Sequence, residues 1–313
     1  MGRIAIAAIF SVLGFVNNGT VMAESFLQFS ENKFVNSGAE IQLCGGDAEG
    51  SCDDCKRCCN GSIVFDYDIL FIKYHQAGGV KTVDAANIVG NGDSAEFDFE
   101  FSPRFSLGYE LSSGLGYRIN YWYFDESAAT NNGGIVSIDT STLDLEIYRR
   151  VDIATCTSVE VSGGYRYLDF EQRDSSGFSD IADTTGPDRT GVDWGLNNWG
   201  GTLGTEISHQ VCNNRRVFAA TRFSILMGDT GLSNAGSLVD TTGSSIDHET
   251  TMIELALGWE STRCLCNGLT LVYGFSGHWW QWSDTAITAD SSGNAELADV
   301  GFGGFALRMG LEY

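Results

Sequence analysis

Proline is nearly absent from this chain, with 2 among 313 residues, whereas glycine occurs 39 times. Because proline cannot donate a hydrogen bond to a β-ladder, its scarcity leaves room for long, regular strands. Beyond the N-terminal segment the chain also lacks an apolar run of about 18 residues, the length that a membrane-spanning helix needs. A helical membrane protein is therefore excluded, and strands are favoured.

Basic residues are also scarce, since 18 Lys and Arg stand against 41 Asp and Glu, for a net charge of −23. Phosphate binding needs concentrated positive charge, so nucleic acid is not an expected partner. Acidic segments such as 174–193 and 284–299 are predicted to be solvated loops, with calcium binding as the open alternative. No EF-hand spacing occurs, and no cofactor is expected.

The N-terminus carries an export signal. Arg3 supplies a positive charge, residues 4–16 are apolar, and Val21-Met-Ala23 forms a small-residue cleavage site. This pattern predicts a secretory signal peptide that is removed after Ala23. Residues 24–61, which hold five of the nine cysteines, are interpreted as a periplasmic extension, and residues 62–313 as one further domain.

The last thirteen residues alternate between two faces. Phe305, Leu307, Met309, Leu311 and Tyr313 fall on one face, and small or charged residues fall on the other. A period of two predicts a strand. An apolar face that ends in a terminal aromatic residue is typical of the closing strand of an outer-membrane β-barrel.

The same alternation recurs in ten segments, which are residues 64–74, 95–111, 114–124, 141–151, 157–170, part of 193–211, 216–228, 250–262, 269–282 and 301–313. Most have 11 to 14 residues, whereas soluble strands average about 5–6 and tilted membrane-spanning strands need about 9–11. Long and short connections alternate strictly between them. We therefore predict an all-β, antiparallel, up-and-down transmembrane barrel of about ten strands, with long extracellular loops and short periplasmic turns.

A barrel of this kind implies a cellular location and binding partners. The protein is expected in the outer membrane, with its apolar faces against lipid and its C-terminal strand recognised by the barrel-assembly machinery. A lipocalin-like barrel would instead carry its apolar faces inside. Strand length, loop asymmetry and the terminal aromatic strand favour the membrane orientation.

Several segments resemble a known family. They are 97–111 (FDFEFSPRFSLGYEL), 142–147 (TLDLEI), 161–168 (VSGGYRYL), 199–206 (WGGTLGTE) and 307–311 (LRMGL). Together they are similar to the pore-forming outer-membrane proteins related to the Legionella major outer-membrane protein. The resemblance covers roughly residues 62–313 and implies a β-barrel with a pore or structural role. It supplies no catalytic residues, and the cysteine-rich segment is not part of it.

Charged residues on the non-lipid faces are candidates to line the lumen. They are Asp98, Glu100, Arg104, Arg118, Asp144, Glu146, Glu160, Arg166, Arg222, Glu254, Arg308 and Glu312. They could line a small pore for ions or solutes, with cation preference from the acidic excess. They could equally form a salt-bridged plug, because barrels of about eight strands are filled by side chains.

The cysteines form a second group of candidates. Cys52, Cys55, Cys58 and Cys59 contain two C-x-x-C spacings, which taken alone suggest a metal site. Disulfides are the favoured interpretation, and no metal is expected, because no histidine ligand closes the run. The disulfide candidates are Cys44, Cys52, Cys55, Cys58, Cys59, Cys156, Cys212, Cys264 and Cys266. The odd count leaves at least one thiol free or joined to a neighbouring molecule.

Tryptophans gather near the predicted outer ends of the strands. The six are Trp122, Trp194, Trp199, Trp279, Trp280 and Trp282. We predict that they form an aromatic girdle at the membrane interface, with an outward sugar-stacking site as the alternative. His75, His248 and His278 are also expected near extracellular strand ends, where a hydrolase could use them.

No G-x-S-x-G or H-E-x-x-H motif is present, so an enzyme is not expected. Small-pore activity is the predicted function. The alternatives are a non-conducting structural or surface-binding barrel cross-linked by disulfides and, third, an outer-membrane hydrolase.

Overall fold

The computed structural model describes residues 61–77, 80–81, 94–129, 135–175, 191–212, 214–235, 246–265, 269–289 and 295–313. The predicted signal peptide and nearly all of the predicted cysteine-rich extension lie outside these residues. In the part described, the chain forms no helix long and apolar enough to cross a membrane.

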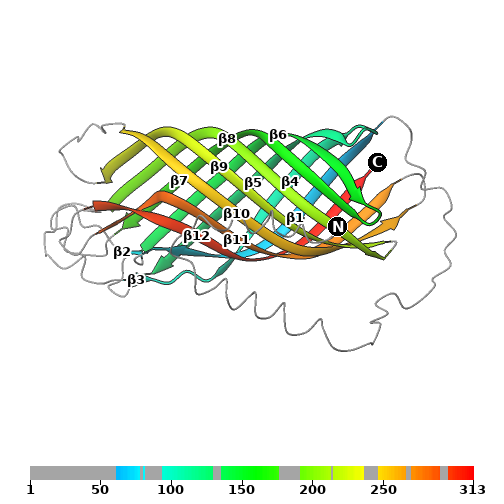
Figure 1. Ribbon diagram of the computed structural model, residues 1–313. Coiled ribbons are helices and arrows are strands. Elements are labelled where there is room, and N and C mark those ends of the chain that lie inside the picture. Colours follow the sequence, from blue (N-terminus) through cyan, green and yellow to red (C-terminus); the bar gives the residue numbers. More distant parts are fainter. Residues whose placement is uncertain are drawn as a thin grey trace, which may run out of the picture. The chain divides into compact units, whose positions relative to one another are not determined.

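Ten strands form a closed antiparallel barrel, so the predicted fold class is confirmed (Figure 1). Apart from the pair that joins its two ends, each strand pairs with its neighbours in chain order, as in an up-and-down barrel. The strands are β1 (Ser62–Gln76), β4 (Phe99–Glu110), β5 (Leu115–Ala129), β6 (Ile135–Ala154), β7 (Thr157–Ser175), β8 (Gly191–Cys212), β9 (Arg215–Ala235), β10 (Ile246–Cys264), β11 (Thr270–Ala289) and β12 (Ala295–Glu312). The short strands β2 (Val80–Lys81) and β3 (Ser94–Ala95) pair separately.

The barrel closes between its first and last strands. β1 pairs with β12 on one side and with β4 on the other, so that Asp68 faces both Arg308 and Arg104. The ladder extends to the last residue, because Ile63 and Tyr313 exchange backbone hydrogen bonds of 2.8 and 2.9 Å. Closure leaves no unpaired strand edge inside the bilayer.

Short turns gather at one end of the barrel, which we call the turn end; the opposite end is the loop end. At the turn end, Gly114 N donates to Leu111 O at 2.9 Å in the turn between β4 and β5. Gly114 has φ +75°, and an added Cβ would lie 2.6 Å from the carbonyl oxygen of Arg150. The turn therefore requires glycine.

Several strands run further toward the loop end than the alternation predicts. β9, for example, continues to Ala235, where the sequence pattern ends near Gly228. Backbone pairing needs no apolar face, so it continues where the chain leaves the lipid. β4, in contrast, is shorter than its alternating segment, because it begins at Phe99 rather than at residue 95. Phe97, which precedes it, is buried and packs on Tyr74, with ring centroids 4.9 Å apart.

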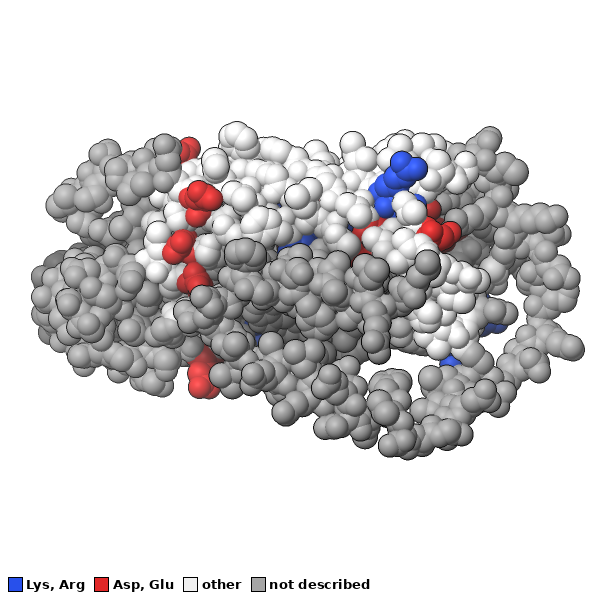
Figure 2. Space-filling model, in the orientation of Figure 1, with Lys and Arg blue, Asp and Glu red and all other residues white. Residues whose placement is uncertain are grey.

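Large apolar side chains cover the outside of the barrel. On β12, Phe305, Leu307 and Met309 are exposed, while Ala306 and Arg308 point into the lumen. Exposed apolar surface of this extent marks a membrane-facing protein rather than a soluble one. Figure 2 shows acidic side chains in a row toward one end and a mostly uncharged surface beside them.

Candidate functional site

Two layers of side chains fill the lumen, and they differ in chemistry. Nearer the turn end lies a set of ion pairs that we call the arginine network, made of Asp68, Arg104, Glu110, Arg118, Asp144, Glu146, Arg150, Glu160, Arg166, Arg216, Arg222, Glu254, Glu260 and Arg308. Nearer the loop end lies the aromatic layer, made of Tyr74, Phe97, Trp122, Phe124, Phe170, Trp280, Trp282 and Phe302.

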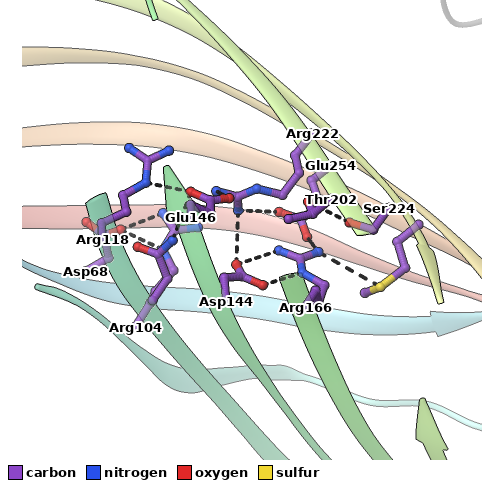
Figure 3. A network of polar contacts seen from close by, with 12 residues as sticks. Asp68, Arg104, Arg118, Asp144, Glu146, Arg166, Thr202, Arg222, Ser224 and Glu254 are labelled. Carbon is purple, nitrogen blue, oxygen red and sulfur yellow. Dashed lines mark hydrogen bonds and ion pairs between the residues drawn. The ribbon is translucent and has the colours of Figure 1, made fainter. Parts of the chain in front are cut away.

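Arg166 is the most deeply buried arginine of the network (Figure 3). Its Nε and Nη2 donate to the two oxygens of Asp144 at 2.5 and 2.8 Å, and its Nη1 donates to Glu254. Bidentate pairing of this kind fixes both side chains as well as neutralising them. Arg222 bridges the same carboxylates, at 3.6 Å from Asp144 and 3.2 Å from Glu254.

A second cluster closes the seam of the barrel. Asp68 accepts from Arg104 Nε at 2.8 Å and from Arg308 Nε at 2.8 Å. Arg308 also donates to Glu260 at 2.6 Å, and Glu260 accepts from Arg216 at 2.6 Å. These contacts link β1, β4, β12, β10 and β9 through the lumen.

The third cluster lies nearest the turn end. Glu160 accepts from Arg118 at 2.7 Å and from Arg150 at 2.9 Å, and Arg150 lies 3.2 Å from Glu110. The Arg118 guanidinium also lies 5.0 Å from the centre of the Tyr148 ring, within cation–π range.

Strand register explains why these partners meet. Asp144 lies directly opposite Arg166 in the ladder between β6 and β7, and Arg118 lies opposite Glu146 between β5 and β6. Opposite charges at directly paired positions on one face contact each other. Both charges in each pair had to point into the lumen, because the other face meets lipid.

Most of the twelve predicted lumen residues enter the arginine network, and the exceptions lie at the two ends. Nine take part in its ion pairs, namely Arg104, Arg118, Asp144, Glu146, Glu160, Arg166, Arg222, Glu254 and Arg308. Glu312 lines a cavity near the turn end. Asp98 and Glu100 are exposed toward the loop end and outside the network: Asp98 precedes β4, whereas Glu100 pairs with Ile72, which is buried in the lumen, and so lies on the lumen-facing side of the ladder.

The predicted set of lumen residues omits five members of the network: Asp68, Glu110, Arg150, Arg216 and Glu260. A signal for them was present, since Asp68 stands between apolar residues in the first alternating segment and Glu260 shares the spacing of Glu254. Arg150 and Arg216 lie close to turns, where alternation alone does not separate a lumen residue from a turn residue.

The predicted aromatic girdle is wrong for four of its six tryptophans, which lie inside the barrel. Trp122, Trp194, Trp280 and Trp282 are buried inside the barrel, while Trp199 and Trp279 are 56% and 44% exposed on its outside. Trp122 pairs across the ladder with Arg104, a lumen residue, so its side chain must also point inward. The same alternation along β11 carries Trp280 and Trp282 inward, and Trp194 donates from Nε1 to Thr285 O at 2.9 Å.

Edge-to-face and tilted ring contacts connect the aromatic layer. The Trp122 and Trp280 ring centroids are 4.8 Å apart, and Phe302 lies 4.7 Å from Trp282 and 5.3 Å from Phe124. Leu, Ile and Met side chains from β1, β7, β8, β9 and β10 lie in the same buried cluster, including Leu70, Ile72, Leu168, Leu196, Leu226 and Met252, none of them accessible to solvent.

The lumen holds cavities of different sizes, and the smallest lies next to the aromatic layer. A chamber of about 140 Å³ is lined by both signs of charge, including Asp66, Arg104, Glu206 and Arg308. A neighbouring cavity of about 70 Å³ lies at the turn end. Where the network meets the aromatic layer, a small cavity of about 10 Å³ remains, lined in part by Trp122 and Trp282.

The three histidines have different surroundings. His278 is buried beside the chamber, within 2.8 Å of Ser276 Oγ, so the prediction that it lies at an extracellular strand end is wrong. His248 Nε2 lies 2.6 Å from the backbone oxygen of Asp284, and His75 is exposed. Within the described ranges, no group of His, Cys, Asp and Glu has the arrangement of a metal site.

The cysteines can be followed only in part. Cys156 is a free, exposed thiol in the turn between β6 and β7, so the pairing predicted for it is not made here. Cys212 and Cys264 at the turn end have interaction partners. Cys44, Cys52, Cys55, Cys58, Cys59 and Cys266 lie outside the described residues, and the disulfide collar stays a prediction.

Comparison with known proteins gives a family match. The family model described as "Legionella pneumophila major outer membrane protein precursor" matches residues 58–312. No curated protein matches the chain. Solved structures with a similar fold include the outer membrane protease OmpT from Escherichia coli, at 11% identity, covering 81% of this chain and 96% of that chain, with a TM-score of 0.45.

Two further solved structures also have a similar fold. The translocator domain of the autotransporter NalP from Neisseria meningitidis is 14% identical, covers 82% of this chain and 89% of its own, and has a TM-score of 0.44. The toluene transporter TbuX from Ralstonia pickettii is 10% identical, with 82% and 90% covered and a TM-score of 0.34.

Proposed function

Because this chain belongs to the family of the Legionella pneumophila major outer membrane protein and is an outer-membrane β-barrel, we propose that it is a structural barrel whose lumen is closed to solutes. In this role the barrel spans the membrane, carries its long connections to the cell surface and keeps the membrane sealed. The role requires no covalent chemistry.

The aromatic layer is the observation that carries this proposal. Trp282, Phe124 and Phe302 have at most 1% of their surface accessible to solvent, although all three point into the lumen. An ion that crossed this layer would lose its hydration without finding polar partners, which is costly in a medium of low dielectric constant. Hydrophobic constrictions of this kind block conduction by excluding water.

The arginine network supports the same role by a different mechanism. Its ion pairs connect strands across the lumen as well as between neighbours, as Arg166 of β7 does with Glu254 of β10. Separating the two partners of a pair would leave an uncompensated buried charge, which costs free energy. The pairs therefore hold the strands that carry them at fixed separations. A barrel cross-braced in this way is stiff rather than readily opened.

A narrow, cation-preferring pore is the second candidate, and the large chamber favours it. Asp66 and Glu206 line this chamber and make no ion pair within the described residues. Unpaired carboxylates in a water-accessible lumen attract cations. For this function, the aromatic layer would have to part.

Conductance in a planar lipid bilayer separates the two functions. The purified barrel is inserted, insertion is verified by protease protection, and current is recorded in potassium chloride beside a porin of known conductance. We expect the inserted protein to give no discrete current steps. Frequent, salt-dependent steps from the unmodified protein would refute the closed barrel and establish the pore.

A further inference from the structure

His278 is a buried histidine at the place where the large chamber meets the aromatic layer. It points into the lumen from β11, lines the chamber and is 7% exposed. Its ring lies edge to face with that of Trp280, a member of the aromatic layer, with centroids 5.9 Å apart. On the neighbouring strands it stands opposite Ala256 and Gly304, neither of which has a polar side chain. The imidazole therefore connects the two layers without an ion pair of its own.

Only one of the two ring nitrogens has a hydrogen-bond partner. Nε2 of His278 lies 2.8 Å from Ser276 Oγ, whereas Nδ1 is buried and has no partner within the described residues. A neutral imidazole has one N–H donor and one acceptor nitrogen, but a protonated imidazole has two donors. Protonation would therefore leave a buried, charged N–H without an acceptor, which costs free energy. The hydrogen bonds of the site fit the neutral ring.

The charges around His278 are balanced without it. Asp68 of β1, Arg104 of β4, Glu254 of β10 and Arg308 of β12 line the same chamber. Both carboxylates already accept hydrogen bonds from arginines. The arginine network as a whole contains seven arginines and seven carboxylates. A proton on His278 would thus add a positive charge to a set that has no carboxylate left over.

The unpaired carboxylates of the chamber stand elsewhere in the barrel. Asp66 pairs in the ladder with Gly310, six residues nearer the turn end than Gly304, the residue opposite His278. Glu206 lies on β8, three strands from β11 in the order of the sheet. Arg104, Asp68 and Arg308 are the charges that act on the ring. Neither unpaired carboxylate is in a position to accept from Nδ1.

We propose that His278 is an acid-sensitive latch between the arginine network and the aromatic layer. While the imidazole is neutral, the chamber wall and Trp280 pack against it. When it takes up a proton, Nδ1 needs an acceptor and the new charge needs water, so the contact with Trp280 loosens and the barrel loses stability. This inference goes beyond the closed barrel and holds whether or not the protein conducts.

Fluorine NMR of the full barrel in detergent, with 5-fluorotryptophan incorporated, follows the latch from pH 8 to pH 3. Trp280→Phe assigns the resonance of Trp280. We expect this resonance to move with pH in the unmodified protein and to stay in place in His278→Gln, which keeps a polar side chain but cannot take up the proton. The resonances of Trp199 and Trp279, which face the outside, should not respond.

Stability gives a second measurement, by urea titration in phospholipid vesicles. A histidine of the unfolded chain takes up its proton near pH 6.5, so a ring that is neutral in the barrel makes the barrel less stable below that pH. We expect the unfolding equilibrium constant of the unmodified protein, relative to that of His278→Gln, to rise about tenfold for each pH unit below about 6.5. Relative to His209→Gln, which changes an exposed ring at the turn end, it should not rise.

Either measurement can overturn the proposal. A Trp280 resonance that ignores pH in the unmodified protein would exclude the latch, even if His278→Gln did not fold. Stability profiles of the unmodified protein and His278→Gln that run parallel from pH 8 to pH 4.5 would also exclude it, because the acid sensitivity would then come from other groups.

Discussion

The arginine network and the aromatic layer both fill the lumen, the first with paired charges and the second with apolar rings. Both fill the inside of a ten-stranded barrel, a size between the eight-stranded barrels that side chains fill and the 16-stranded porins that leave a channel. Near the turn end, paired charges fill it, and cavities of about 140 and 70 Å³ remain. Near the loop end, buried aromatic rings and aliphatic side chains fill it.

This difference follows from how each kind of side chain packs. An ion pair fixes a few atoms by direction and leaves water-sized gaps around them, whereas rings and branched chains interlock at crystal-like density. Under the proposed function, the charged layer holds the strands together and the aromatic layer closes the lumen. Four experiments probe this division of roles, beginning with the largest expected effect.

Emptying the aromatic layer should convert a silent barrel into a conducting one. We expect the triple variant Trp122→Ala, Trp282→Ala and Phe302→Ala to show discrete current steps in a planar bilayer, since three of the largest buried lumen side chains are removed. The matched control carries Trp199→Ala, Trp279→Ala and Phe305→Ala on the outside of the barrel and should stay silent. A silent inner triple variant would mean that other side chains close the lumen.

Removing Arg166 should destabilise the barrel strongly. Arg166→Ala leaves Asp144 and Glu254 buried beside one fewer positive charge, and we expect a loss of about 3–5 kcal/mol in the free energy of unfolding. Urea titration in phospholipid vesicles, followed by tryptophan fluorescence, measures it. Arg173→Ala breaks the exposed pair with Glu171 and should cost less than about 1 kcal/mol; equal losses would contradict the role of burial.

Adjacent glycines of β12 compare the crowded lumen with the open lipid face. A Cβ on Gly304 would collide with the carbonyl oxygen of Phe71, whereas a Cβ on Gly303 meets nothing within 4 Å. Gly304→Ala should therefore cost about 1–3 kcal/mol in the same titration, and Gly303→Ala close to nothing. If the two variants were equally stable, the lumen at this level would be looser than described.

The smallest expected effect concerns the charge of the chamber. In the conducting inner triple variant, Asp66→Asn with Glu206→Gln removes two carboxylates that have no ion pair within the described residues. We expect the preference for potassium over chloride to fall roughly twofold, because the acidic excess attracts cations. The reversal potential in a salt gradient measures the ratio, and an unchanged ratio would place the selectivity elsewhere.

Much of the barrel could be predicted from the sequence. The period of two along each segment gives strands, and the alternation of long and short connections gives their antiparallel order and number. The same period also separates lumen from lipid, as Arg104, Arg118 and Arg308 demonstrate. It could have placed Trp122 inside as well, since Trp122 shares the spacing of Arg118 and Asn120 in its segment.

The position of each side chain along the barrel axis was harder to predict than the face on which it lies. Trp122 and Trp282 stand near the ends of their alternating segments, where a girdle is expected, but the strands extend well past those points. The extension raises the loop end of the barrel and leaves these residues within the lumen. Phe97 shows the converse, because β4 starts later than its alternation suggests.

The sequence by itself determined the strands of the barrel, their number, their order and the face of most side chains within the alternating segments, because these depend on neighbours along the chain. Tertiary structure alone decided which charges pair and which rings meet, because that depends on the stagger between strands. Asp68 and Arg308 lie 240 positions apart, and the closing ladder brings them together. A shift of one residue in that ladder would turn one of the two side chains toward lipid.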